Sequence, residues 1–159
     1  GLKGYSHIGG SGVGGGLLLG LGKKLSNASD FESLCSIAAG GNLSNVDLTV
    51  GDISKSDIEK LISEMTSANL ANIKDGASDG DLALGLINMV LQTILTLASF
   101  ACRDSGINNI ILTGSLTELE WLEPLVKVFR SMSSFNYIIP PEAAFATAVG
   151  AALHCTDIK

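Results

Sequence analysis

A stretch rich in glycine constrains this chain more than any other feature, because six of the eight residues from 9 to 16 are glycine. Ordered glycine loses more backbone entropy than any other residue, so this density is typical of chain that takes unusual dihedrals or lies against a ligand. The stretch opens into a predicted helix, 15–25, whose N-terminus would present free N–H groups and a positive dipole end to a phosphate. The alternative is a tight turn that packs closely against a neighbouring element.

Two known phosphate-binding loops fit the stretch poorly. A Walker A loop is excluded, because Leu17 stands where it requires glycine and Lys24 stands where it requires Ser or Thr. The dinucleotide pattern G-x-G-x-x-G does occur, ending at Gly15, with Asp30 further along. That fingerprint requires a second strand after the helix, whereas residues 29–32 read as a capping box that opens another helix. A dinucleotide-dependent oxidoreductase is therefore disfavoured.

Composition narrows the class of protein further. The chain has 159 residues, enough for one domain with a real core, and only 16% of them are charged. The net charge of −6 argues against a surface for nucleic acid or an anionic membrane. The three cysteines lie far apart without metal-ligand spacing, so we expect a reducing, cytoplasmic compartment and no metal site. The first residues fall inside a predicted strand, so we expect the chain to be a piece of a longer protein.

Hydrophobic periodicity, capping signals and turn residues predict an α/β fold with a small, mostly parallel sheet flanked by helices. The first predicted elements are a strand at 2–8, helices at 15–25, 29–39 and 45–53, a short helix from Ser56 and a loop at 66–80. They are followed by a long helix at 81–103, a strand at 109–113, a helix at 116–132, a strand at 137–139 and a helix at 142–154.

The long helix 81–103 carries no charge between its two end residues, which is compatible with a membrane span. Four polar residues on one helical face favour instead a helix buried between two layers or at a subunit interface: Asn88, Gln92, Thr96 and Ser99. The apolar face exceeds what a small lobe is expected to bury, so we predict a homodimer centred on this helix and no membrane partner. That face carries Leu84, Ile87, Leu91, Ile94 and Leu95.

Several motifs resemble a known family. Residues 7–16 with 20–22, and residues 45–53, resemble the type II (eukaryotic-like) pantothenate kinases. Residues 111–115 look like the adenosine-side motif of the actin-like ATPase superfamily, and residues 142–151 look like its small-residue connecting helix. The motifs follow in the right order over nearly the whole chain.

The resemblance implies that residues 1–159 form the C-terminal, nucleotide-binding lobe of a two-lobe enzyme with the actin-like ATPase (ribonuclease H-like) fold. The implied activity is phosphorylation of pantothenate by ATP and Mg²⁺, the first step of coenzyme A biosynthesis, by a homodimer. In that family the other lobe supplies the glycine-rich phosphate hairpin, a metal-associated Asp and the catalytic Glu, and this sequence offers none of them. We therefore expect no catalytic residue in this chain and no activity from it alone.

The resemblance also implies site residues. It places the nucleotide phosphates against backbone groups that need no particular side chain. It matches Phe31 to a position near the adenine, for which core packing is the alternative, and Ser115 to another nucleotide contact, for which a helix cap is the alternative. The implied phosphate contacts are Gly15, Gly16, Leu17, Leu18 and Leu19.

One residue departs from the family pattern. His7 stands where the resembled kinases carry a substrate-contacting Arg, and a mostly neutral imidazole cannot replace a permanent, bidentate charge. The substrate thus stays open between pantothenate and a related pantoyl compound or sugar alcohol. A different alternative is a non-catalytic module of the same fold that binds nucleotide or dimerises.

Overall fold

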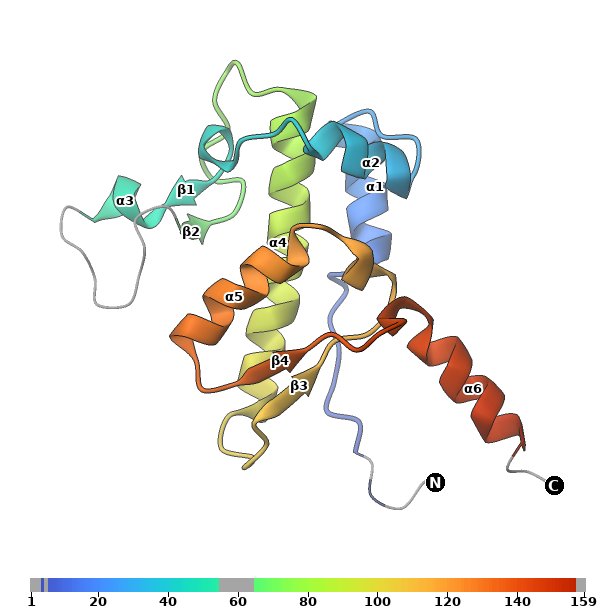
Figure 1. Cartoon of the computed structure of the whole chain (residues 1–159). Helices are drawn as coiled ribbons and strands as arrows, with labels where there is room; N and C mark the ends of the chain where they lie inside the picture. Colours follow the sequence, from blue (N-terminus) through green and yellow to red (C-terminus); the bar gives the residue numbers. More distant parts are fainter. Residues whose placement is uncertain (1–3, 5, 55–64, 157–159) are drawn as a thin grey trace.

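The computed structural model describes residues 4, 6–54 and 65–156 of the chain (Figure 1). A long helix, α4, runs through the middle of the molecule, with α1 and α2 beside its N-terminal half and α5 and β3 against its remainder. The elements are α1 (Gly15–Leu25), α2 (Phe31–Ala38), η1 (Leu43–Asn45), β1 (Leu48–Thr49), α3 (Val50–Ile53), β2 (Thr66–Ala68), α4 (Asp79–Cys102), β3 (Asn109–Ile111), η2 (Ser115–Glu118), α5 (Leu122–Met132), β4 (Asn136–Ile138), η3 (Ala143–Phe145) and α6 (Ala146–Thr156).

Helix α4 begins at a capping box. The Ser78 hydroxyl accepts from the backbone N–H of Asp81, and the Asp81 carboxylate accepts from the backbone N–H of Ser78. The same carboxylate accepts from the backbone N–H of Asn42 at 2.7 Å and from the side chain of Asn45 at 3.2 Å. These bonds, led by the one from the Ser78 N–H, lower the pKa of Asp81, although its burial acts in the opposite direction.

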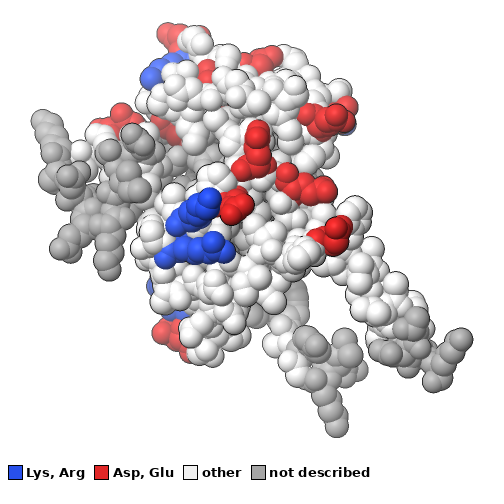
Figure 2. All heavy atoms as spheres, in the orientation of Figure 1, with Lys and Arg blue, Asp and Glu red and all other residues white. Residues whose placement is uncertain are grey.

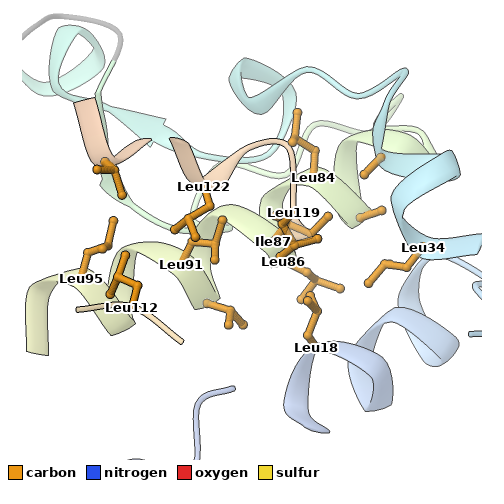
Figure 3. Packing of buried hydrophobic residues seen from close by; sticks show 14 of the residues in the cluster. Leu18, Leu34, Leu84, Leu86, Ile87, Leu91, Leu95, Leu112, Leu119 and Leu122 are labelled. Atoms are coloured by element: carbon orange, nitrogen blue, oxygen red, sulfur yellow. The ribbon is translucent and has the colours of Figure 1, made fainter. Parts of the chain in front are cut away.

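The apolar face of α4 is covered by the chain itself. Leu84, Ile87, Leu91 and Leu95 are buried in the main hydrophobic core, and Ile94 is half-buried against it (Figure 3). Leu18 from α1, Leu34 from α2 and Leu122 from α5 belong to the same cluster. The expectation that this face exceeds what the lobe can bury is therefore wrong, because α1, α2 and α5 together cover it.

Helix α4 is long and apolar enough to cross a membrane, by length and composition alone. Half of its most apolar window is buried inside the protein. Its burial among the other helices identifies α4 as the core helix of this fold, which accounts for its apolar composition.

A polar network joins α4 to the antiparallel pair β1–β2. The Asp47 carboxylate is fully buried and accepts hydrogen bonds from the hydroxyl of Thr66 at 2.7 Å, the backbone N–H of Leu70 at 2.8 Å and the side-chain amide of Asn88 at 2.9 Å. Buried polar groups are costly unless they are hydrogen-bonded, so these bonds stabilise the packing of β1–β2 on the helix. The prediction that the polar stripe marks a buried helix is confirmed at Asn88.

The parallel pair β3–β4 covers the C-terminal part of α4. Ile110 lies opposite Tyr137, which is fully buried and shares a 2.5 Å hydrogen bond with the hydroxyl of Ser99 on α4. The described residues contain this two-stranded parallel sheet and the separate β1–β2 sheet. The fold is thus mixed α/β with a small parallel sheet and one long helix, as predicted.

The strongest departure from prediction lies at residues 45–53, which do not form one helix. The Asp47 side chain is drawn into the buried network, and the N–H of Val50 donates to the carbonyl of Met65 across the β1–β2 pair. These tertiary bonds override the local helical pattern and divide the segment among the end of η1, β1 and α3.

Other boundaries differ by less. The capping residue of α2 is Asp30, whose carboxylate accepts from the N–H of Ser33 at 2.8 Å, and not Ser29. The predicted helix 116–132 is split into η2 and α5 because Leu119 is extended, and the predicted helix 142–154 is split into η3 and α6. Strand β2 and the start of α4 interrupt the predicted loop 66–80.

Two predictions concern the edges of the described residues. The strand predicted at 2–8 is absent from the described part of that range, since residues 6–8 form neither helix nor strand. Residues 2, 3 and 5 of that strand and the helix predicted from Ser56 lie outside the described residues.

Candidate functional site

A cavity of about 270 Å³ lies between the N-terminus of α1 and the loop that follows β3. It brings together Gly15 and Ser115, two predicted nucleotide contacts from distant parts of the sequence. Its lining combines three hydroxyl-bearing residues with apolar residues from α4, η2 and α5. The lining residues are Gly15, Leu91, Ile94, Leu112, Thr113, Gly114, Ser115, Leu116, Thr117 and Leu122.

The N-terminus of α1 has no side-chain cap. Its N-cap residue, Gly14, is extended, and the first bond along the helix runs from the N–H of Leu18 to the carbonyl of Gly14 at 3.0 Å. The N–H groups of Gly15, Gly16 and Leu17 therefore precede the helical ladder and have no partner within it. Such a helix end is suited to bind an anion.

The glycines at this helix end leave room for a ligand. A Cβ on Gly16 would meet nothing within 4 Å, and one on Gly15 would meet only the side chain of Leu116, at 3.8 Å. Leu18 differs, because its N–H is held inside the helix and its side chain is fully buried. By the same helical pattern the N–H of Leu19 also bonds within the helix. The phosphate contacts of Leu18 and Leu19 stay predictions.

The loop after β3 is fixed by Gly114, whose φ of +99° lies in the region that favours glycine. Its N–H donates to the carbonyl of Ala143 at 2.9 Å, and its carbonyl accepts from the hydroxyl of Thr117 at 2.7 Å. These bonds place the exposed Ser115 at the start of η2. The alternative for Ser115, a helix cap, is wrong, because the N-cap residue of η2 is Gly114 and that of α5 is Trp121.

Two other predicted residues do not line the cavity. Phe31 is half-buried at the start of α2 and packs against the main core, as the alternative interpretation predicts. His7 is exposed in the irregular segment before α1. Their proposed contacts, with adenine and with substrate, stay predictions.

The described residues that line the cavity are polar or apolar and uncharged. No residue that lines it is charged, so its backbone N–H groups are the source of positive potential for a phosphate. Within the described residues no group of three or more His, Cys, Asp or Glu side chains could hold a metal ion.

Sequence reasoning missed part of the lining. Thr113, Gly114 and Thr117 lie beside Ser115 in the cavity, and none was singled out as a contact. The signal was present, since a glycine directly after a buried strand often permits a loop that a side chain would block. The role of Thr117 is visible only in the structure, because its bond to Gly114 depends on the turn of η2.

Comparison with known proteins gives a consistent result. A family model described as Fumble matches residues 1–153. A type II pantothenate kinase of Bacillus thuringiensis subsp. konkukian (strain 97-27) is 28% identical over 159 residues, which covers 98% of this chain. A type II pantothenate kinase of Staphylococcus haemolyticus (strain JCSC1435) is 28% identical over 154 residues, which covers 94% of this chain. The chain spans 58% of the length of each relative and matches the C-terminal part.

Proposed function

The chain belongs to the Fumble family, and from that premise we propose that it is the C-terminal, nucleotide-binding lobe of an ATP-dependent pantothenate kinase. The complete enzyme would phosphorylate pantothenate in the cytoplasm, as the first step of coenzyme A biosynthesis. One observation carries the assignment to nucleotide. The uncapped N-terminus of α1 offers the N–H groups of Gly15, Gly16 and Leu17 beside the cavity that also contains Ser115.

In this proposal the lobe holds the phosphates and the other lobe supplies the chemistry. Phosphoryl transfer depends mainly on positioning and electrostatic stabilisation, which backbone N–H groups at a helix end can provide. A protein-held Mg²⁺ does not fit the described residues, because they include no cluster of metal-ligating side chains. The proposal therefore places Mg²⁺ with the ATP phosphates and the other lobe.

The substrate side of the proposal depends on His7. This residue is exposed and stands where the resembled kinases carry Arg, so we assign it to substrate binding without a permanent positive charge. Pantothenate is the substrate that the names of the relatives support. A related pantoyl compound or sugar alcohol is the alternative that the exchange of Arg for His favours.

A homodimer also belongs to the proposal, with a different contact surface from the buried face of α4. Leu97 and Phe100 are exposed near the C-terminal end of α4 and lie three residues apart, on one side of the helix. An exposed apolar pair of this kind suits an interface. Light scattering at micromolar concentration is expected to give a dimer mass that Leu97→Asp reduces to the monomer.

The proposed function is tested on the purified 159-residue chain. Calorimetric titration is expected to show binding of ATP, and a coupled assay with pantothenate is expected to show no turnover. A missing catalytic group typically costs orders of magnitude in rate. Turnover above background would contradict the division between lobes, and absence of ATP binding would contradict the nucleotide assignment.

A further inference from the structure

Thr117 lies where three cavities meet. It lines the cavity that contains Gly15 and Ser115 (the nucleotide cavity) and two neighbours, of about 420 Å³ toward α5 and about 240 Å³ toward η3. No other described residue lines all three of these cavities. The side chain is half-buried, and the proposed function gives it no part. A residue in this place can determine the shape of the nucleotide cavity without touching the nucleotide.

Both polar groups of Thr117 bind one carbonyl. Its hydroxyl donates to the carbonyl oxygen of Gly114 at 2.7 Å, and its backbone N–H donates to the same oxygen at 3.0 Å. On the other side, the N–H of Gly114 donates to the carbonyl of Ala143 at 2.9 Å. The peptide groups on both sides of Gly114 are therefore held. The second of them carries the N–H of Ser115, so Thr117 sets the direction of that N–H across a planar peptide.

The same turn determines how close Ser115 lies to α1. Leu116, between Ser115 and Thr117, is half-buried against the main core. Its side chain would lie 3.8 Å from a Cβ on Gly15. The turn of η2 thus meets the N-terminus of α1, whose first N–H groups have no partner in the helix. A change in the turn would move Ser115 relative to these groups.

The charges around the nucleotide cavity favour one orientation of a nucleotide. Glu118 and Glu120 are exposed at the end of η2 and just after it, and Figure 2 shows acidic side chains gathered over this part of the molecule. Carboxylates repel phosphate, whereas the N-terminus of α1 attracts it. This arrangement favours phosphates at Gly15 and Gly16 and a nucleoside along residues 113–117.

We propose that Thr117 is a positioning residue for the nucleotide, which holds the loop 113–116 so that one ligand contacts both Ser115 and the N-terminus of α1. The inference rests on the proposed function and deepens it. It divides the nucleotide cavity into a phosphate half on α1 and a nucleoside half on residues 113–117, and it assigns Thr117 to the nucleoside half. Thr117 acts through the Gly114 carbonyl and not by contact with the ligand.

One substitution and two ligands test the division. Thr117→Val removes the hydroxyl and keeps nearly the same volume, and calorimetric titration of the purified chain compares ATP with inorganic tripolyphosphate. The variant is expected to bind ATP at least about fivefold more weakly, the effect of one hydrogen bond of ordinary strength. Its affinity for tripolyphosphate is expected to be unchanged, because the phosphate half on α1 is intact. General damage to the fold would weaken the binding of both ligands alike.

Two further variants serve as controls. Thr117→Ser keeps the hydroxyl and is expected to retain the ATP affinity of the unmodified chain. Thr93 on α4 is also half-buried, and its hydroxyl donates to the carbonyl of Met89 at 2.7 Å, but it does not line the nucleotide cavity. Thr93→Val is therefore expected to cost a similar amount of stability in urea unfolding as Thr117→Val and to leave the ATP affinity unchanged.

Each contrary result has a separate meaning. If the unmodified chain binds ATP and Thr117→Val binds it equally well, this inference is overturned while the proposed function stands. Equal loss of ATP and tripolyphosphate affinity, or a Thr117→Ser variant as weak as Thr117→Val, would overturn it as well. Absence of tripolyphosphate binding by the unmodified chain would overturn the division into halves. Absence of ATP binding by the unmodified chain would overturn the proposed function, and this inference with it.

Discussion

The glycines at the N-terminus of α1 and those where α2 meets α4 have opposite surroundings. A Cβ on Gly41 would lie 2.3 Å from the carbonyl oxygen of Gly80 and 2.8 Å from the Cβ of Leu84. A Cβ on Gly14 or Gly16 would meet nothing within 4 Å. The first glycine allows two backbones to touch, whereas the other two lie beside open space.

This difference in surroundings distinguishes two roles of glycine, close packing and room for a ligand, that the sequence alone cannot distinguish. At the crossing of α2 and α4, glycine is required by packing inside the protein. At the N-terminus of α1, close packing was the alternative to a ligand, and the described structure gives no packing reason for Gly16. Open glycines beside free N–H groups are what a bound phosphate requires.

The largest effect is expected at the packed crossing. Gly41→Ala forces the backbone that follows α2 away from Gly80 of α4, and no flexible side chain can yield, so we expect a loss of about 4 kcal/mol or failure to fold. The neighbouring Gly40→Ala is the matched control, because a Cβ there meets nothing within 4 Å. Urea unfolding of both variants measures the difference. Equal stabilities would show that the crossing is not closely packed.

The second-largest loss of stability is expected in the hydrogen-bond network of Asp47. Asp47→Ala removes the acceptor of the Thr66 hydroxyl and the Leu70 N–H, and one of the acceptors of the Asn88 amide, at a cost of about 3 kcal/mol. Asp75→Ala removes an exposed carboxylate and is expected to change the free energy of unfolding by less than about 0.5 kcal/mol. A melting temperature of Asp47→Ala equal to that of Asp75→Ala would contradict the network.

Low pH is expected to lower the free energy of unfolding by a smaller amount, through Asp81 at the start of α4. The pKa of Asp81 is lowered in the folded state, chiefly by the Ser78 N–H, so its contribution to stability is complete above its ordinary value of 3.8. That contribution is lost as the pH falls through the lowered folded-state pKa. Thermal unfolding between pH 7 and pH 2 is expected to show the unmodified chain approaching Asp81→Asn in stability at the acidic end. A constant difference between them would contradict this role.

Much of the fold was predictable because it depends on local signals. Helix α1 has the predicted bounds, and α4 differs from its prediction by two residues at the start and one at the end. Strands β3 and β4 were predicted from short apolar runs, and their parallel pairing from the order of elements. By contrast, the secondary structure of residues 45–53 depends on the buried carboxylate of Asp47, whose partners Thr66 and Asn88 come from distant segments.

The candidate site was predictable at its two glycine-bearing turns and less so elsewhere. Gly15 and Ser115 meet at one cavity because β3 and α1 pack on the same helix. The burial of Leu18 and the core packing of Phe31 depend on neighbouring helices, which no local pattern specifies. The dimer face was misjudged for the same reason, since composition does not reveal how much apolar surface the other helices cover.

The central claim, that the N-terminus of α1 binds phosphate, is tested most directly by a methyl group on Gly16. Gly16→Ala is expected to change the free energy of unfolding by no more than about 1 kcal/mol, because the position is open and Ala favours a helix. It is expected to weaken ATP binding by the chain at least tenfold, about 1.4 kcal/mol. Gly20→Ala, equally open on the same helix, is expected to leave the ATP affinity unchanged. A destabilised Gly16→Ala with unaltered ATP affinity would contradict the account.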